Sequence, residues 1–207
     1  PVVVHSREAT QDTIDILKKY SVVEKGIFHC CPLNQELIKE GLSIGDYISF
    51  SGNITFKNAN SEDAGGAIYS ISSFIVVNCS FACNHATSGG AIYCNQGKGG
   101  DCTVVDCTFI SNSAQYRAGA IMYGSALNCI FFNNTATGSG GALFFAGGVT
   151  DLIINDINFT TAHATGSGGV IYIGGATTRF NITNTNFADT KGSYGGALYF
   201  LNNIDKF

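Results

Sequence analysis

The sequence is poor in several residue types that mark common classes of protein. It has no tryptophan, one methionine and two prolines, and only 13% of its 207 residues are charged. It contains no run of about 18 apolar residues, the length that a helix needs to cross a bilayer, so we expect no transmembrane helix. Lysine and arginine are not clustered, and the net charge is −4. Because nucleic acids are bound by clustered cations, the chain as a whole is not expected to bind them.

Glycine, in contrast, is abundant, and most of it belongs to one recurring phrase. The phrase is Gly-Gly-Ala-Ile-Tyr or a close variant, and its copies begin at Gly65, Gly89, Ala118, Gly140, Gly168 and Gly195. Successive copies start 24, 29, 22, 28 and 27 residues apart, and a phenylalanine stands eight or nine residues before each copy. A unit that recurs at this period is typical of a repeat architecture rather than of a globular core.

The residues around each phenylalanine alternate with a period of two, which predicts a strand. The position two before it is isoleucine, cysteine or threonine, and we expect this slot to face inward with the phenylalanine. The position three before it, expected to face outward, is always polar: Asn53, Asn78, Asp106, Asn128, Asp156 and Asn184. No tight hairpin dipeptide separates the strands, so they are expected to stack in parallel, about 4.8 Å apart, as a parallel β-helix.

Stacking of identical slots predicts ladders of like side chains inside the solenoid. The first ladder is Phe56, Phe81, Phe109, Phe131, Phe159 and Phe187. The second, on another wall, is Ile68, Ile92, Ile121, Leu143, Ile171 and Leu198, with the tyrosines that follow pointing outward. In the alternative, the opposite side chains of this wall face the interior, so that alanine and tyrosine point inward. Three asparagines, Asn84, Asn112 and Asn134, follow the phenylalanines and are expected at corners, because asparagine tolerates the left-handed region.

The Gly-Gly-Ala-Ile phrase and the Phe-x-x-Asn spacing together resemble the repeats of the polymorphic outer-membrane protein family. These are surface autotransporters whose passenger is a right-handed β-helix used in adhesion. The resemblance covers about residues 50–207, although the last two coils lack the asparagine. It implies a right-handed parallel β-helix of about five to six coils over residues 47–207, with a location at the cell surface or outside the cell.

Residues 1–46 show a different pattern, in which strands alternate with helices. Strands are expected at residues 1–5, 26–30 and 46–50, with amphipathic helices over about 9–20 and 34–44. Strands that alternate with helices predict a parallel sheet. We therefore expect a short α/β segment before the repeats, with the joint between the two parts inside residues 51–60.

The order Pro-Val-Val-Val-His-Ser-Arg-Glu, then Phe-His-Cys, then Tyr-Ile-Ser-Phe-Ser-Gly-Asn resembles the middle of TatD-type metal-dependent hydrolases. These are TIM-barrel phosphodiesterases that act on DNA. The resemblance implies a piece of a TIM barrel in which His5 and His29 are metal ligands at the ends of neighbouring strands. The family's His-x-His pair, bridging glutamate and late aspartate have no counterpart here, whereas a catalytic metal normally has three protein ligands. The metal site is therefore expected to be incomplete.

Other candidate chemical groups are better explained as structural. Asp106 and Asp156 share a slot two coils apart, roughly 9 to 10 Å by strand spacing, and are expected to belong to an outward polar ladder rather than to a catalytic pair. His85 and His163 are expected at the surface near corners. Three cysteines, Cys79, Cys107 and Cys129, are expected as reduced core residues. Cys94 and Cys102 bracket a loop that a disulfide could close.

These observations favour a non-enzymatic surface or secreted β-helix segment, used in adhesion or structural binding and fused to an incomplete metal-hydrolase fragment. No cofactor is expected, and the partner is an unidentified surface, polysaccharide or protein ligand, with no nucleic acid expected for the repeats. The alternative is a truncated, inactive TatD-like phosphodiesterase. A divalent metal and a cytoplasmic location would follow if the hydrolase resemblance governs.

Overall fold

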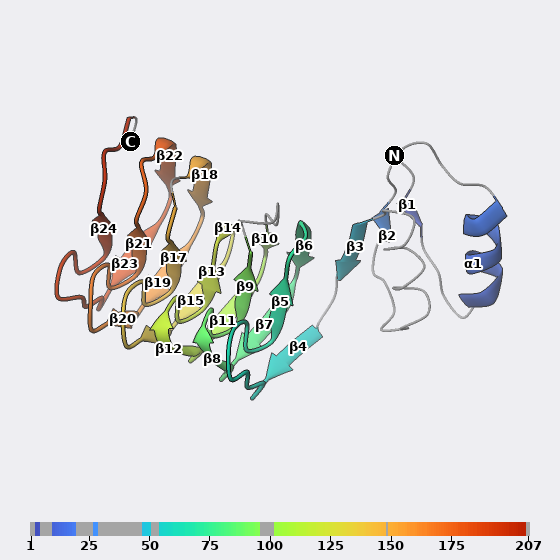
Figure 1. The fold of residues 1–207 in the computed structure, drawn as a ribbon, viewed down its shortest axis with the longest axis horizontal. Coiled ribbons are helices and arrows are strands. Elements are labelled where there is room, and N and C mark those ends of the chain that lie inside the picture. Colours follow the sequence, from blue (N-terminus) through green and yellow to red (C-terminus); the bar gives the residue numbers. More distant parts are fainter. Residues whose placement is uncertain are drawn as a thin grey trace.

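The computed structural model of the chain describes residues 3–4, 10–19, 27–28, 47–50, 54–95, 102–147 and 149–205. These residues form a parallel β-solenoid with four walls, each wall a sheet whose strands come from successive coils (Figure 1). Two of the sheets have six strands, which confirms the prediction of a parallel β-helix with five to six coils. One α-helix occurs in the described part of the chain, α1 (Thr10–Lys19).

The four walls are named here after their size or content. The long sheet contains β1 (Val3–Val4), β2 (Ile27–Phe28), β3 (Tyr47–Phe50), β6 (Phe74–Val77), β10 (Cys102–Val105), β14 (Gly124–Leu127), β18 (Thr150–Asn155) and β22 (Thr178–Thr183). The phenylalanine sheet contains β4 (Ile54–Lys57), β7 (Cys79–Ala82), β11 (Thr108–Ile110), β15 (Ile130–Phe132), β19 (Asn158–Thr160) and β23 (Asn186–Ala188).

The two remaining walls complete each coil. The four-stranded sheet contains β8 (His85–Ser88), β12 (Ser113–Arg117), β16 (Thr135–Ala136) and β20 (His163–Ala164). The isoleucine sheet contains β5 (Ile68–Ser70), β9 (Ile92–Cys94), β13 (Ile121–Met122), β17 (Leu143–Phe145), β21 (Ile171–Ile173) and β24 (Leu198–Phe200). The pairing between neighbouring strands is parallel throughout, so equivalent residues of successive coils lie side by side.

The six phenylalanines form one continuous stack inside the solenoid. Neighbouring ring centroids are 4.7 to 5.2 Å apart, from Phe56 at one end to Phe187 at the other. The four inner rings are fully buried, whereas Phe56 and Phe187 are partly buried. The ring spacing matches the strand spacing, so each ring fills the volume between the rings above and below it.

The isoleucine sheet sends its aliphatic column into the same core and its aromatic column outward. Ile92, Ile121, Leu143 and Ile171 are at most 1% exposed, and Ile68 and Leu198 pack against the core from the ends. In the next column the rings of Tyr69 and Tyr93 lie 5.5 Å apart and those of Phe144 and Tyr172 4.6 Å apart, while Met122 and Phe144 are buried in a second, smaller cluster. The alanines of the glycine phrase are buried in the middle coils, at Ala91, Ala120 and Ala142, and partly buried at Ala67 and Ala197.

The Gly-Gly pair makes the corner that leads into this wall, and a different constraint requires glycine at each of its two positions. The first one adopts φ of +61° to +69° at five of its six positions, a conformation that glycine enters without strain. The second lies against the next coil, where a β-carbon on Gly90 would come within 2.1 Å of the carbonyl oxygen of Gly119. In the third coil Ala118 takes the first position with φ +58°, so this corner is strained.

The Phe-x-x-Asn asparagines lie at the corners between the phenylalanine sheet and the four-stranded sheet, as expected, but they do not adopt the left-handed conformation. The left-handed residue is the one before each of them: Cys83, Ser111 and Asn133 have φ of 54° to 55°. Asn84, Asn112 and Asn134 themselves are fully buried. The turn before them directs the asparagine side chain inward, where it meets the main chain of the neighbouring coil.

The buried asparagines form a ladder of hydrogen bonds between coils. The side-chain oxygen of Asn112 accepts from the main-chain nitrogen of Asn84 at 3.0 Å and from its side-chain nitrogen at 2.9 Å. The side-chain nitrogen of Asn112 donates to the carbonyl of Phe81 and to the oxygen of Asn134, both at 3.0 Å. The ladder therefore satisfies main-chain groups that a corner would otherwise leave buried and unpaired.

The strands of the N-terminal part continue the long sheet. β1 pairs with β2, β2 with β3, and β3 with β6, all in parallel, and Phe50 lies beside Val76. The hydrolase-like strands are thus added to the edge of the solenoid (Figure 1). The predicted helix over about 9–20 corresponds to α1, whereas the predicted helix over 34–44 lies outside the described residues. The boundary between residues 46 and 47 stays a prediction.

Replacing a central member of the phenylalanine stack should be costly. Phe109→Ala removes ring contacts on both sides at 4.8 and 4.7 Å and should lower the free energy of unfolding by roughly 3 to 5 kcal/mol. Phe187→Ala should cost less, because it has one stacking neighbour, Phe159. Chemical denaturation measures both, with Phe132→Ala on the outer face as the control. Equal small losses at Phe109 and Phe187 would contradict the stack.

Removing the middle asparagine of the ladder should also destabilise the coils. Asn112→Ala leaves several buried donors and acceptors unpaired, each worth about 1 to 3 kcal/mol, so we expect a loss of roughly 2 to 4 kcal/mol. Asn158→Ala, an exposed position on a strand, should change stability by less than about 0.5 kcal/mol. The ladder would be unimportant if urea denaturation gave the same midpoint for both variants.

Candidate functional site

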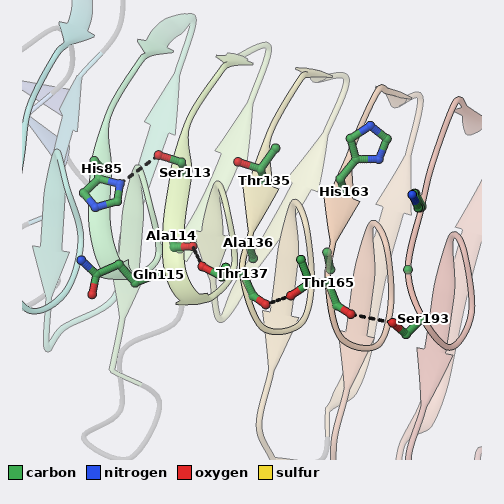
Figure 2. A pocket seen from close by; sticks show the side chains of 13 residues that line it. His85, Ser113, Ala114, Gln115, Thr135, Ala136, Thr137, His163, Thr165 and Ser193 are labelled. Atoms are coloured by element: carbon green, nitrogen blue, oxygen red, sulfur yellow. Dashed lines mark hydrogen bonds between the residues drawn. The ribbon is translucent and has the colours of Figure 1, made fainter.

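The outer face of the four-stranded sheet is hollowed into a groove that runs across the coils (Figure 2). One wall is an aligned column of His85, Ser113, Thr135, His163 and Lys191. The floor consists of small residues, Ala114, Ala136, Ala164 and Gly192. The other wall contains Gln115, Thr137, Thr165 and Ser193, and the hollow has a volume of about 730 Å³.

The groove follows from the sequence of each coil. Its first wall lies four residues after each phenylalanine of the stack, its floor five after and its second wall six after. The floor alanines are only 4% to 5% exposed, because their side chains alternate with those of the two walls and point to the other face of the sheet. Because the strands are parallel and in register, equivalent positions of successive coils build continuous walls.

The second wall contains a row of hydroxyl groups that already donate their hydrogens to carbonyl groups of the protein. Thr137 donates its hydroxyl hydrogen to the carbonyl of Ala114 at 3.3 Å, and Thr165 donates to the carbonyl of Thr137. Ser193 donates to the carbonyl of Thr165 at 2.6 Å (Figure 2). Each hydroxyl therefore offers the groove an oxygen that accepts hydrogen bonds.

The two histidines of the repeats lie near corners, as expected: they are the first residues of β8 and β20, and both line this groove. Nδ1 of His85 lies 2.9 Å from the hydroxyl oxygen of Ser113. Nδ1 of His163 is buried and has no hydrogen-bond partner in the protein. The first wall therefore contains one imidazole nitrogen that has no partner in the protein and is closed off from solvent.

One strand of the groove carries an extra residue that changes the rim. The register of β12 against β8 shifts between Ala114 and Arg117, which places Tyr116 outward with 61% of its surface exposed. The guanidinium of Arg117 lies 5.1 Å from the centre of the Phe144 ring, a cation–π contact. Tyr116 and Arg117 line a second hollow of about 480 Å³ with Ser88, Gly138 and Ser139, the next residues of the same coils.

The remaining candidate groups from the sequence do not come together. His5 and His29 lie outside the described residues, and within the described ranges no three histidine, cysteine, aspartate or glutamate side chains are grouped as a metal site. Asp106 accepts a hydrogen bond from Asn128 at 2.5 Å, and Asp156 one from Asn155 at 2.5 Å. Asp156 does not line the hollow beside Asp106.

The six cysteines in the described part of the chain form no disulfide, and those of the predicted core column are buried. The main-chain nitrogen of Cys79 lies 3.4 Å from the sulfur of Cys107, and that of Cys107 lies 3.4 Å from the sulfur of Cys129. Hydrogen bonds from Cys129 and Cys79 lower the pKa of Cys107, while the bond to Cys107 and burial raise the pKa values of the two outer thiols. The three side chains are at most 3% exposed.

Cys94 and Cys102 are also free and buried, so the structure contains no disulfide between them. Among the described residues, no helix is long and apolar enough to cross a membrane.

Two different families match separate parts of the chain. The family described as "TatD related DNase" matches residues 1–76, and the "Chlamydia polymorphic membrane protein repeat" matches residues 128–146. Both resemblances inferred from the sequence are thus confirmed. The first extends beyond the hydrolase-like strands into β6, and the second falls on one coil that includes β15, β16 and β17.

The curated relatives match the N-terminal part. An uncharacterized metal-dependent hydrolase of Escherichia coli K12, YcfH, is 45% identical over 60 residues, which are 28% of this chain and 23% of that protein. Another, YabD of Bacillus subtilis 168, is 40% identical over 60 residues, 28% of this chain and 24% of that protein. The chain spans about a quarter of the length of these relatives. No solved structure matches it. The chain is therefore similar to a hydrolase family at its start and to a surface-protein repeat in its coils.

Proposed function

We propose that the chain is a non-enzymatic β-helix segment of a surface or secreted protein, which acts in adhesion or structural binding through the outer faces of its coils. The observation that supports this most is the groove on the four-stranded sheet, because it is assembled from equivalent residues of five successive coils. A surface that spans several repeats is how solenoid proteins bind extended partners. The match to a polymorphic membrane protein repeat supports the same role.

The N-terminal part is proposed to be an incomplete hydrolase fragment that carries no activity in this chain. The relatives it resembles are named metal-dependent hydrolases, and the fragment covers less than a quarter of each. Of the ligands that the resemblance implies, the sequence retains His5 and His29. Two histidines are fewer than the three protein ligands that normally hold a catalytic metal and leave a position for water.

The proposal predicts binding without hydrolysis. The labelled full chain should bind intact cells and matrix-coated surfaces saturably, and unlabelled chain should compete for the same sites. The same preparation, incubated with Mn²⁺ and bis(4-nitrophenyl) phosphate, should release nitrophenol at the rate of the buffer blank, and His29→Ala should leave this rate unchanged.

The hydrolase alternative gives the opposite pattern. Stoichiometric metal bound to the purified chain, together with phosphodiester hydrolysis, and the loss of both in His29→Ala, would overturn the proposal. Absence of saturable binding to every surface would also contradict it, because the coils would then have no adhesive role.

A further inference from the structure

The groove on the four-stranded sheet has a chemistry that restricts what can lie in it. It runs across the strands, along the direction in which the coils stack, so an occupant must be a long chain (Figure 2). Equivalent side chains recur at each coil, about 4.8 Å apart, so the occupant must also present similar groups at a short repeat. A linear polymer of small units meets both conditions.

The second wall requires an occupant with hydrogen-bond donors. The hydroxyls of Thr137, Thr165 and Ser193 each donate to a carbonyl of the preceding coil, which leaves their oxygens as acceptors. A polymer that carries acceptors only, such as a bare polyphosphate, could not use this wall. Sugar hydroxyl groups are donors as well as acceptors, so a polysaccharide can donate hydrogen bonds to this wall.

The charge around the groove requires the occupant to be acidic. Lys191 lines it directly, and Arg117 lies at the adjoining hollow. Of the described residues that line the two hollows, none is an aspartate or a glutamate. Glu62 belongs to the first coil, where its carbonyl accepts a hydrogen bond from Thr87 of the next coil, and Lys191 belongs to the last coil.

A peptide fits the groove less well. Peptides are often captured by pairing with the free edge of a sheet, where unpaired main-chain groups supply the hydrogen bonds. Here the groove crosses the face of a sheet whose strands pair with one another, with His85, Ser113, Thr135 and His163 in register. A peptide in the groove would have to satisfy its own main chain from side chains alone.

We propose that this groove binds a linear acidic polysaccharide, laid across the coils with its hydroxyl groups against Thr137, Thr165 and Ser193 and its anionic groups towards Lys191 and Arg117. The proposal rests on the surface-binding role and names the class of ligand for it. Uronate carboxylates and sulfate esters share the required chemistry.

The proposal predicts selective binding by the full chain in calorimetry or biolayer interferometry. Hyaluronan and polygalacturonate test uronates, heparin tests sulfates, and dextran is the neutral control. Lys191→Gln and Thr165→Val should each weaken binding of the preferred polymer about three- to tenfold, the range for loss of one hydrogen bond or charge contact. Lys57→Gln is the matched control, since it removes an exposed lysine from the phenylalanine sheet. Circular dichroism should show the same fold in each variant.

Several outcomes would overturn the proposal. Equal weakening by Lys57→Gln and Lys191→Gln would show attraction by charge alone. Equal binding of dextran would remove the need for an acidic ligand, and equal binding of poly-L-glutamate would indicate an acidic peptide instead. If the chain binds cells saturably but none of the three acidic polysaccharides, this inference fails while the adhesive role stands.

Discussion

The parallel hydrogen-bond ladder between successive coils is the interaction on which the rest of the structure depends. It holds equivalent residues of each coil side by side, so every choice of residue type is repeated along the wall. The phenylalanine rings stack at 4.7 to 5.2 Å because their strands are held at that spacing. The same constraint lines up the hydroxyl groups of the groove. A solenoid thereby turns a pattern within one coil into a surface that spans the molecule.

The corners are the energetically demanding part of the fold, because the chain must turn four times in a coil without leaving buried polar groups unpaired. At one corner, the first glycine of the phrase adopts a left-handed conformation and the second lets the main chains of two coils approach closely. At another corner, the side chains of the buried asparagines form hydrogen bonds with main-chain groups of the neighbouring coil. In the coil that contains β19, alanine (Ala162) stands in the asparagine position. It is still fully buried, so this coil keeps the packing but lacks the hydrogen bonds of the asparagine side chain.

The edge of the long sheet explains how hydrolase-like strands and repeats coexist in one chain. The first coil has a parallel edge at β6, and an unpaired edge accepts any strand of suitable alternation. β3 fills it, with Ser49 beside Ile75, and β2 and β1 follow. The hydrolase family match also runs through β6, so residues 74–76 belong to both patterns. In the metal-dependent hydrolases that the chain resembles, parallel strands are likewise the unit, which makes the two architectures compatible at a shared strand.

The sequence by itself determined the repeat, the parallel solenoid and the residue types at each slot, because period-two alternation and the Gly-Gly phrase act within a single coil. The groove residues can also be located in the sequence, at four, five and six positions after each phenylalanine. Nothing in the sequence near these positions identifies them as a binding site, however. Tertiary structure alone decided that the side chain of Asn112 points inward from its corner, because its hydrogen-bond partners lie on neighbouring coils. It likewise decided that His163 faces a groove, since a hollow exists only where several coils contribute walls and floor at once.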